Sequence, residues 1–181
     1  MVTQPAINDR VPASTVAAAA SGDALALSRI VAAYHADLVR LAYVVTGDAE
    51  LAQDAAQSAW AIAWRKLGSL SDPARLRQWL FTVAANEARQ ALRRRRRSPV
   101  HPIEVVEIGS SAGDPARRVA TIDLERALRG LTPEERLLIG MRHLGGFDSR
   151  EIGEALGISP EAVRTRLTRL VARLRTELGD D

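Results

Sequence analysis

The sequence predicts an all-α protein made of two small helical domains that a flexible linker joins. Apolar side chains recur at helical spacing over residues 24–97 and again over residues 122–178. Between these stretches, residues 98–119 are rich in Pro, Gly, Ser and Asp. A loop of this length is uncommon inside a compact domain, so it predicts a domain boundary. We therefore expect a leader at 1–21, a first domain at 22–97, a linker at 98–119 and a second domain at 120–181.

The composition is that of a soluble globular protein, because 46% of the 181 residues are apolar and 26% are charged. No apolar run approaches the roughly 20 residues needed to cross a bilayer, and the N-terminus lacks the features of a signal peptide. We therefore expect a cytoplasmic protein without membrane insertion. The chain has no cysteine and its three histidines lie far apart, so neither a metal site nor a cofactor is expected.

The leader is rich in alanine and has no apolar periodicity, so residues 1–21 are expected to be disordered or weakly helical. The first long helix is expected to begin near Ala24. It ends at Thr46, because Gly47 can adopt the left-handed conformation that closes a helix. Its apolar positions are Ile30, Tyr34, Leu38, Leu41 and Val45.

Two more helices complete the predicted first domain. Asp48 is a good N-cap for a helix that runs to about Leu67, and we interpret its tryptophans Trp60 and Trp64 as packing residues. Asp72 and Pro73 then begin a third helix, because proline favours the first helical position. This helix continues into the five consecutive arginines at residues 93–97.

The second domain is predicted to contain four helices. The first includes Leu124 and Leu131, and Pro133 begins the second. Asp148, with Glu151 three residues later, has the spacing of a capping box and predicts a third helix over Ser149–Leu156. After a turn at Gly157, Pro160 begins a fourth helix that runs to about Leu178.

The last two helices have the sequence form of a helix-turn-helix. On a helical wheel, the apolar residues from Val163 to Leu178 fall on one stripe that must face the core. The opposite face and its flanks carry arginines and short hydroxyl side chains, which suit the major groove of DNA. A polar face exposed to solvent is the alternative. The residues of this face and its flanks are Glu161, Arg164, Thr165, Arg166, Thr168, Arg169 and Ala172.

Positive charge is concentrated in the first domain. Residues 29–97 carry twelve basic and six acidic side chains, whereas residues 98–181 carry twelve and fourteen. Aromatic side chains beside arginines, such as Trp79 and Arg89, suit single-stranded DNA, because rings stack on bases while guanidinium groups hold phosphates. The five arginines at 93–97 have two interpretations: a phosphate clamp, or charges favoured by the dipole at a helix end.

At this point the sequence resembles a known family. The stretch from "GDALALSRIVAAYHADL" to "QALRRRRR" is similar to the second conserved region of extracytoplasmic-function sigma factors of the sigma-70 family. The stretch "LERALRGLTPEERLLIGMRHLGGFDSREIGEALGISPEAVRTRLTRLVARLRTEL" is similar to their fourth. The resemblance covers residues 22–97 and 122–178, in the order found in the family.

The resemblance implies roles for residues of the first domain. The motif "AQDAAQSAW" places Asp54 and Gln57 against the clamp helices of the polymerase β′ subunit, although Ser58 departs from the acidic residue usual at its position. The loop 68–77 and the face of the third helix match the part that captures a flipped base of the −10 promoter element. The candidate −10 residues are Arg75, Arg77, Trp79, Asn86, Arg89, Arg93 and Arg94.

The resemblance also assigns the second domain to the −35 element and to the polymerase β flap. Arg164, Thr165, Thr168 and Arg169 match positions that read the −35 element in the major groove, in agreement with the helical wheel. Glu161 and Arg166 complete the set of candidate −35 residues.

The function implied is that of a sigma factor, which binds core RNA polymerase and promoter DNA and promotes −10 opening. It is not itself an enzyme, and the sequence contains no clustered histidines, phosphate-binding glycine loop or catalytic triad. An anti-sigma partner is expected by the same resemblance. The alternative is a stand-alone helix-turn-helix regulator that dimerises through its N-terminal helices, and the tandem of two distinct modules speaks against it.

Overall fold

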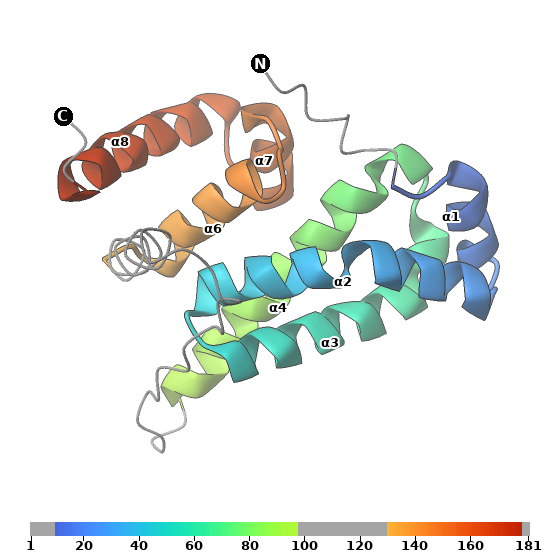
Figure 1. The fold of residues 1–181 in the computed structure, drawn as a ribbon. Coiled ribbons are helices and arrows are strands. Elements are labelled where there is room, and N and C mark those ends of the chain that lie inside the picture. Colours follow the sequence, from blue (N-terminus) through green and yellow to red (C-terminus); the bar gives the residue numbers. More distant parts are fainter. Residues whose placement is uncertain (1–9, 98–129, 179–181) are drawn as a thin grey trace, which may run out of the picture.

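The computed structural model describes residues 10–97 and 130–178. All the regular secondary structure in these ranges is helical (Figure 1). The all-α prediction is confirmed. The first range contains α1 (Ala13–Ala20), α2 (Ala24–Thr46), α3 (Ala49–Lys66) and α4 (Leu76–Arg97), with the short 3₁₀ turns η2 (Leu67–Ser69) and η3 (Pro73–Arg75). The second contains α6 (Pro133–His143), α7 (Ser149–Leu156) and α8 (Pro160–Leu178). The linker and the helix expected around Leu124 lie outside the described residues.

Helix α2 ends and helix α3 begins at the capping residues that the sequence predicted. Asp23 accepts hydrogen bonds from the Leu25 and Ala26 amides at the start of α2. Gly47 closes α2 with a φ of 68°, in the left-handed region. The Asp48 side chain then accepts from the Leu51 amide at 2.9 Å and begins α3. A single residue therefore separates the cap of α3 from the end of α2, and the chain turns back sharply.

Helices α2, α3 and α4 pack against one another around a shared core. The side of α3 that faces this core consists of alanines, which are almost wholly buried and let the neighbouring backbones approach closely. Larger side chains of α2 and α4 fill the space, among them Leu38, Leu41, Leu80 and Phe81. The small face of α3 thus leaves its opposite face as a continuous exposed surface.

Part of the N-terminal leader is an ordered helix. Residues 13–20 form α1, which buries Val16 and Ala19 against the first domain, so of the two expected states the helical one holds for this part and the disordered one is wrong. Arg10 fixes the entry to the helix, because its guanidinium donates to Asp37 Oδ2 at 2.5 Å and to the Ala33 carbonyl at 3.2 Å. Val16 and Ala19 are the two buried residues of α1, and two positions in an alanine-rich sequence are too few to show an apolar periodicity. Residues 1–9 lie outside the described residues.

The two tryptophans of α3 have different surroundings. Trp60 is half-buried, packs against the core and donates its indole N–H to His35 Nδ1 at 3.2 Å. Trp64 is 50% exposed, so its interpretation as a packing residue is wrong. The buried residues of α3 are all alanines, so neither tryptophan occupies a fully buried position on this helix.

The second domain is organised by two capping boxes. Thr132 and Glu135 exchange side-chain and backbone hydrogen bonds at the start of α6, and Asp148 and Glu151 do so at the start of α7, as the spacing predicted. Gly157 then turns the chain with a φ of 70°. A Cβ on Gly153 would lie 2.6 Å from the Ile158 carbonyl oxygen, so the close approach of the turn to α7 requires glycine.

The two helical units lie against each other. Helix α6 packs on α2, and α7 packs beside the start of α4 (Figure 1). A Cβ on Gly140 would lie 2.7 Å from Leu41 Cδ1 and 3.6 Å from Val44 Cγ1, whereas one on Gly47 would lie 3.0 Å from the Arg136 guanidinium. Helices α2 and α6 therefore run in opposite directions in direct contact.

Candidate nucleic-acid interface

Helix α8 presents a face of arginines and short hydroxyl side chains to solvent. Ile152 of α7 and Val163 of α8 are fully buried, and they set the phase of α8 against the core. The opposite face of an amphipathic helix is then exposed. All six residues predicted to read the −35 element are exposed, namely Glu161, Arg164, Thr165, Arg166, Thr168 and Arg169.

The arginines of this face have carboxylate neighbours. Arg164 donates to Glu161 Oε1 at 2.6 Å, and bonds from the Glu161 amide and from Arg164 hold the pKa of the Glu161 carboxyl below its usual range. Arg166 and Arg169 line a hollow of about 380 Å³ between α6 and α8, beside the pair of Arg173 and Glu135. Ion pairs this exposed are weak, so the arginines can exchange carboxylates for phosphates or bases.

Four of the residues predicted to bind the −10 element lie on one face of α4. Trp79, Asn86, Arg89 and Arg93 are separated by seven, three and four residues, which is the spacing of one helix face. Asn86 and Arg93 are exposed, as is neighbouring Arg94, while Trp79 and Arg89 are half-buried. Trp79 packs against the core, and Arg89 Nε is buried without a hydrogen-bond partner. This face offers one amide and several guanidinium groups to a ligand.

Two other arginines of α4 point inward. Arg77 and Arg95 share the phase of the buried residues Phe81, Ala84 and Ala88. Both find partners within the chain. The spacing of residues 77, 81, 84, 88 and 95 in the sequence is that of one helix face.

Arg95 is half-buried and pairs with a residue of the first domain. Its guanidinium pairs with Asp48, whose side chain is only 15% exposed and also caps α3. Burial opposes ionisation of Asp48, but the bonds from the Leu51 amide and Arg95 outweigh it and lower the pKa of the carboxyl. In this structure Arg95 is therefore engaged within the chain, whereas the other four arginines of the block are exposed, and the phosphate clamp stays a prediction.

Arg77 is buried, with 6% of its surface exposed, against two phenylalanine rings. Its guanidinium carbon lies 5.2 Å from the Phe81 ring centroid and 5.1 Å from that of Phe147, and the two rings meet edge to face. Arg77 Nη2 donates to the Leu144 carbonyl at 3.1 Å, while Nε has no partner. Burial, with a smaller contribution from the charge of Arg10, lowers the pKa of Arg77. No single strand can reach Arg77 in this arrangement.

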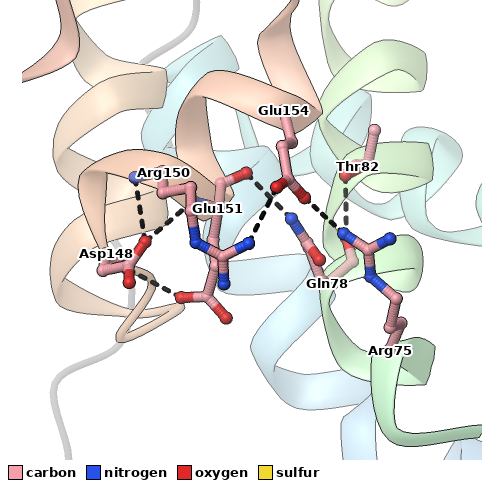
Figure 2. Close-up of polar contacts among 7 residues, drawn as sticks. All are labelled: Arg75, Gln78, Thr82, Asp148, Arg150, Glu151 and Glu154. Atoms are coloured by element: carbon pink, nitrogen blue, oxygen red, sulfur yellow. Dashed lines mark hydrogen bonds and ion pairs between the residues drawn. The ribbon is translucent and has the colours of Figure 1, made fainter. Parts of the chain in front are cut away.

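The residues around Arg77 also contact the second domain. Arg75 forms an ion pair with Glu154, and Gln78 Nε2 donates to the Glu151 carbonyl oxygen at 2.9 Å (Figure 2). Figure 2 shows Arg150 reaching the same Glu154 carboxylate, at 2.9 Å. These groups surround a hollow of about 420 Å³ between η3, α4 and α7. Phe147, which the sequence reasoning did not single out, lines it as well.

The exposed face of α3 carries the predicted polymerase-binding residues. Asp54 and Gln57 are exposed three residues apart, and Ser58 beside them is half-buried. Trp64 continues the same face seven residues beyond Gln57. The buried alanines on the other side of α3 fix this orientation.

Residues 10–97 and 130–178 contain no group of three or more His, Cys, Asp or Glu side chains that could hold a metal ion. Over the same ranges, no helix combines the length and the apolar character that crossing a bilayer requires.

A helix-turn-helix with an arginine-rich exposed face, preceded by a second basic helical unit, defines a two-module DNA-binding transcription protein. Residues 30–98 match the family model of Sigma-70 region 2, and residues 121–174 match that of Sigma-70, region 4. The chain belongs to the sigma-70 family of RNA polymerase sigma factors, in its extracytoplasmic-function (ECF) group. The resemblance seen in the sequence motifs is confirmed.

Relatives support this assignment over most of the chain. The ECF sigma factor SigM of Mycobacterium tuberculosis is 30% identical over 172 residues, which cover 95% of this chain and 87% of SigM. SigL of the same species is 31% identical over 91% of this chain and 96% of SigL. The probable sigma factor RfaY of Xanthomonas campestris pv. campestris is 31% identical, and there the alignment spans 88% of this chain but only 42% of RfaY.

Solved structures share the fold. CnrH, in complex with the cytosolic domain of CnrY, superposes with a TM-score of 0.69 and 26% identity over 93% of this chain and 97% of that one. The sigma factor RpoE of Bartonella quintana, in complex with the anti-sigma factor NepR, also has a TM-score of 0.69 over 85% of this chain and 97% of that one, at 22% identity.

Proposed function

We propose that this protein binds core RNA polymerase, directs it to promoters with −10 and −35 elements, and helps to open the −10 region. The observation that carries the proposal is the presence of two exposed basic surfaces in one chain. One lies on α4 within the region 2 match, and the other lies on α8 within the region 4 match. The protein acts in the cytoplasm and supplies recognition, while the chemistry belongs to the polymerase.

The −35 element is assigned to α8. Arginine pairs with guanine in the major groove and threonine contacts a thymine methyl or a phosphate, and both residue types are exposed on this helix. Thr165 and Thr168 stand between the arginine positions 164 and 169. The second domain also contacts the polymerase β flap.

The −10 element is assigned to η3 and α4. Asn86 is the base-reading residue, Trp79 supports it from the core, and Arg89, Arg93 and Arg94 hold the backbone. Arg77 lies at the start of the same surface and is covered by the second domain in this structure, whereas Arg75 is half exposed and pairs with Glu154 of that domain. A contribution from Arg77 requires that the domain moves away.

Core polymerase is assigned to the exposed face of α3, through Asp54 and Gln57. The reversal Asp54→Lys is expected to weaken core binding about tenfold or more, because a hydrogen bond to a charged group contributes about 1.5–3 kcal/mol. The matched control is Ser28→Ala, an exposed change on α2. Affinity for core polymerase is measured by titration, and circular dichroism confirms that the helices are retained.

Transcription in vitro tests the whole proposal. Core polymerase with and without the protein is supplied with a pool of templates, and start sites are mapped. Starts that appear only with the protein and share two upstream motifs support it. Activity equal to that of core alone, together with tight binding of palindromic DNA without polymerase, would instead establish a stand-alone regulator.

An anti-sigma partner is also proposed, because the similar RpoE of Bartonella quintana was solved with the anti-sigma factor NepR. Since this chain has no cysteine, redox sensing would belong to the partner. Affinity purification of the tagged protein identifies such a partner, and loss of transcription on adding the purified partner verifies its role.

A further inference from the structure

The short helix α1 lies against the loop 67–75, which joins α3 to α4 (Figure 1). This loop contains η2 and η3, and both pack on α1. Val16 and Ala19, the two buried residues of α1, belong to the same apolar cluster as Leu67 of η2 and Leu76 at the start of α4. The N-terminal segment of the chain therefore supports a loop that is distant from it in the sequence.

The backbones of α1 and of the loop approach each other closely at Gly68. A Cβ on Gly68 would lie 3.3 Å from the Ala20 carbonyl oxygen, which is tighter than an ordinary van der Waals contact. Leu67 beside it is almost wholly buried, so the loop starts from a fixed point in the core. A shift of α1 would reach the loop directly, because this contact joins backbone to backbone and has no flexible side chain to absorb the movement.

Helix α1 is anchored at both ends. Before its start, Arg10 donates to the Asp37 carboxylate and to the Ala33 carbonyl oxygen of α2. After its end, Gly22 turns the chain with a φ of 96°, and Asp23 caps α2. A helix of eight residues is not stable by itself in water, so α1 depends on these anchors and on its buried side chains.

Hydrogen bonds within the loop are short-range. The Ser69 hydroxyl donates to the Lys66 carbonyl oxygen at 2.7 Å, and the Asp72 carboxylate accepts from the Ala74 amide at 2.9 Å. Such bonds shape single turns, but they do not fix the loop relative to the rest of the first domain. The loop exposes polar side chains, among them Ser69 and Asp72. Within the first domain, the packing of the loop on α1 and on the core therefore sets the position of these polar groups.

We propose that α1 is a positioning element for −10 recognition: the docked helix holds the loop 67–75 in the shape that selects the flipped base. The proposal rests on the proposed function, which assigns this loop to the −10 element. A flipped base is read in a closely fitting pocket, so a small displacement of the loop weakens the selection. Helix α1 precedes residue 30, where the match to region 2 begins, and the proposal gives this segment a role in promoter selectivity.

Three variants of α1 test this role. Val16→Asp releases the helix from its docking site, because a carboxylate at this buried position must return to water. Ala17→Asp is the matched control, since it introduces the same side chain into the same helix at an exposed position. Val16→Ile keeps an apolar side chain of similar shape and should keep α1 docked.

Hydrogen exchange followed by mass spectrometry measures the loop directly. In Val16→Asp we expect faster exchange than in the wild-type chain over residues 13–20 and 67–75, while the amides of α3 and α4 keep their protection. Ala17→Asp and Val16→Ile should exchange like the wild-type chain. Fast exchange of α1 without faster exchange of the loop would overturn the proposal, because the loop would then keep its shape without α1.

Base selection is measured with the complex of core polymerase and the protein, on −10 strand oligonucleotides that differ at one base. At the position of the flipped base, Val16→Asp should lower the ratio of affinities for the preferred and the other bases about fivefold or more, because a specific base contact is weakened. Affinity for core polymerase and discrimination at −35 positions should stay as in the wild-type chain. Equal losses at all −10 and −35 positions, or weaker core binding, would assign α1 to the stability of the first domain alone.

A second variant guards against misfolding of Val16→Asp. Arg10→Gln removes the anchor before α1 and leaves the buried residues unchanged, so it should alter loop exchange and base selection in the same direction. Arg29→Gln, at an exposed position of α2, is the control for the lost charge. A wild-type chain that directs no promoter-specific transcription would refute the proposed function, whereas a released α1 with unchanged base selection would refute the positioning role alone.

Discussion

At the scale of single residues, the position of an arginine on its helix decides what it does. Arg95 and Arg77 occur among many arginines, yet both stand at the buried phase of α4 and bind partners within the chain. Arg93 and Arg94 stand at the outward phase and are exposed. A guanidinium group is too strongly polar to be buried alone, so each inward arginine is matched by a carboxylate or by aromatic faces.

The pair of Asp48 and Arg95 predicts a pH-dependent contribution to stability. Because the pKa of Asp48 is lowered in the folded chain, its contribution is present above the unfolded value of about 4 and is lost as the pH falls through the folded value. Asp48→Asn keeps the N-cap but removes the charge, and it should reduce the free energy of unfolding by about 0.5–1 kcal/mol at pH 7.

The measurement is urea unfolding at pH 7 and at about pH 3, followed by circular dichroism. The difference between wild type and Asp48→Asn should shrink at the lower pH, because protonation of Asp48 removes the charge that Arg95 pairs with. Asp23→Asn is the control, because it keeps a cap that bonds backbone amides and changes stability little at either pH. An equal difference at both pH values would argue against the ion pair.

Arg169 is expected to read a base rather than to bind a phosphate alone. Arg169→Ala should lower the discrimination at one −35 position by about 1–3 kcal/mol, because a bidentate contact to guanine is lost. Binding of the polymerase complex to single-base variants of the promoter measures this effect. Arg175→Ala, near the other end of α8, is the control, and uniform weakening across all the variants would assign Arg169 to the backbone.

At the scale of elements, α4 has two functions on two faces. Its inward face closes the core with Leu80, Phe81 and Ala84, and its outward face carries Asn86 and the exposed arginines. The sequence predicted this helix and its capped start, because Asp72 and Pro73 are local signals. The pairing of Arg95 with Asp48 joins residues 47 positions apart, and no local pattern reports a contact of that range.

The end of α4 predicts how DNA affinity depends on salt. Neutralising two outward arginines by Arg93→Gln and Arg94→Gln should flatten the slope of log affinity against log salt by about 1.4, because each phosphate contact to a single strand contributes about 0.7. The slope is measured with polymerase complex and −10 strand oligonucleotides.

Arg95→Gln is the matched control for this pair of substitutions. It should leave the slope nearly unchanged and lower the stability of the chain instead, because Arg95 pairs with Asp48. An altered preference for −10 bases in the double variant would show that Arg93 and Arg94 read sequence and do not only hold the backbone.

At the scale of the whole molecule, the packing of α6 on α2 and of α7 on α4 brings the two DNA-binding modules together. Arg77 lies at the centre of this contact, with Phe81 from its own domain and Phe147 from the other. One side chain therefore links the core of the first domain to the second. The arrangement hides part of the −10 surface while the −35 face of α8 stays exposed.

Replacement of Arg77 by lysine tests this central contact. Arg77→Lys keeps the charge, but an ammonium group is compact and strongly hydrated and cannot stack on aromatic faces as a planar guanidinium does. We expect lower fluorescence energy transfer between labels on α2 and α8, with the helix content unchanged. A distance distribution identical to that of the wild-type chain would show that the stacking does not hold the domains together.

The helices, their caps and the exposed face of α8 could be predicted from the sequence alone, because these follow from periodicity and from side chains within one turn of each other. The family could be predicted as well, through two motifs in a fixed order. The packing of residues 13–20 as a helix, the exposure of Trp64 and the burial of Arg77 against Phe147 became apparent in the folded chain. These outcomes depend on surfaces distant in sequence, whose shapes and charges meet when the chain folds, so no local pattern reports them.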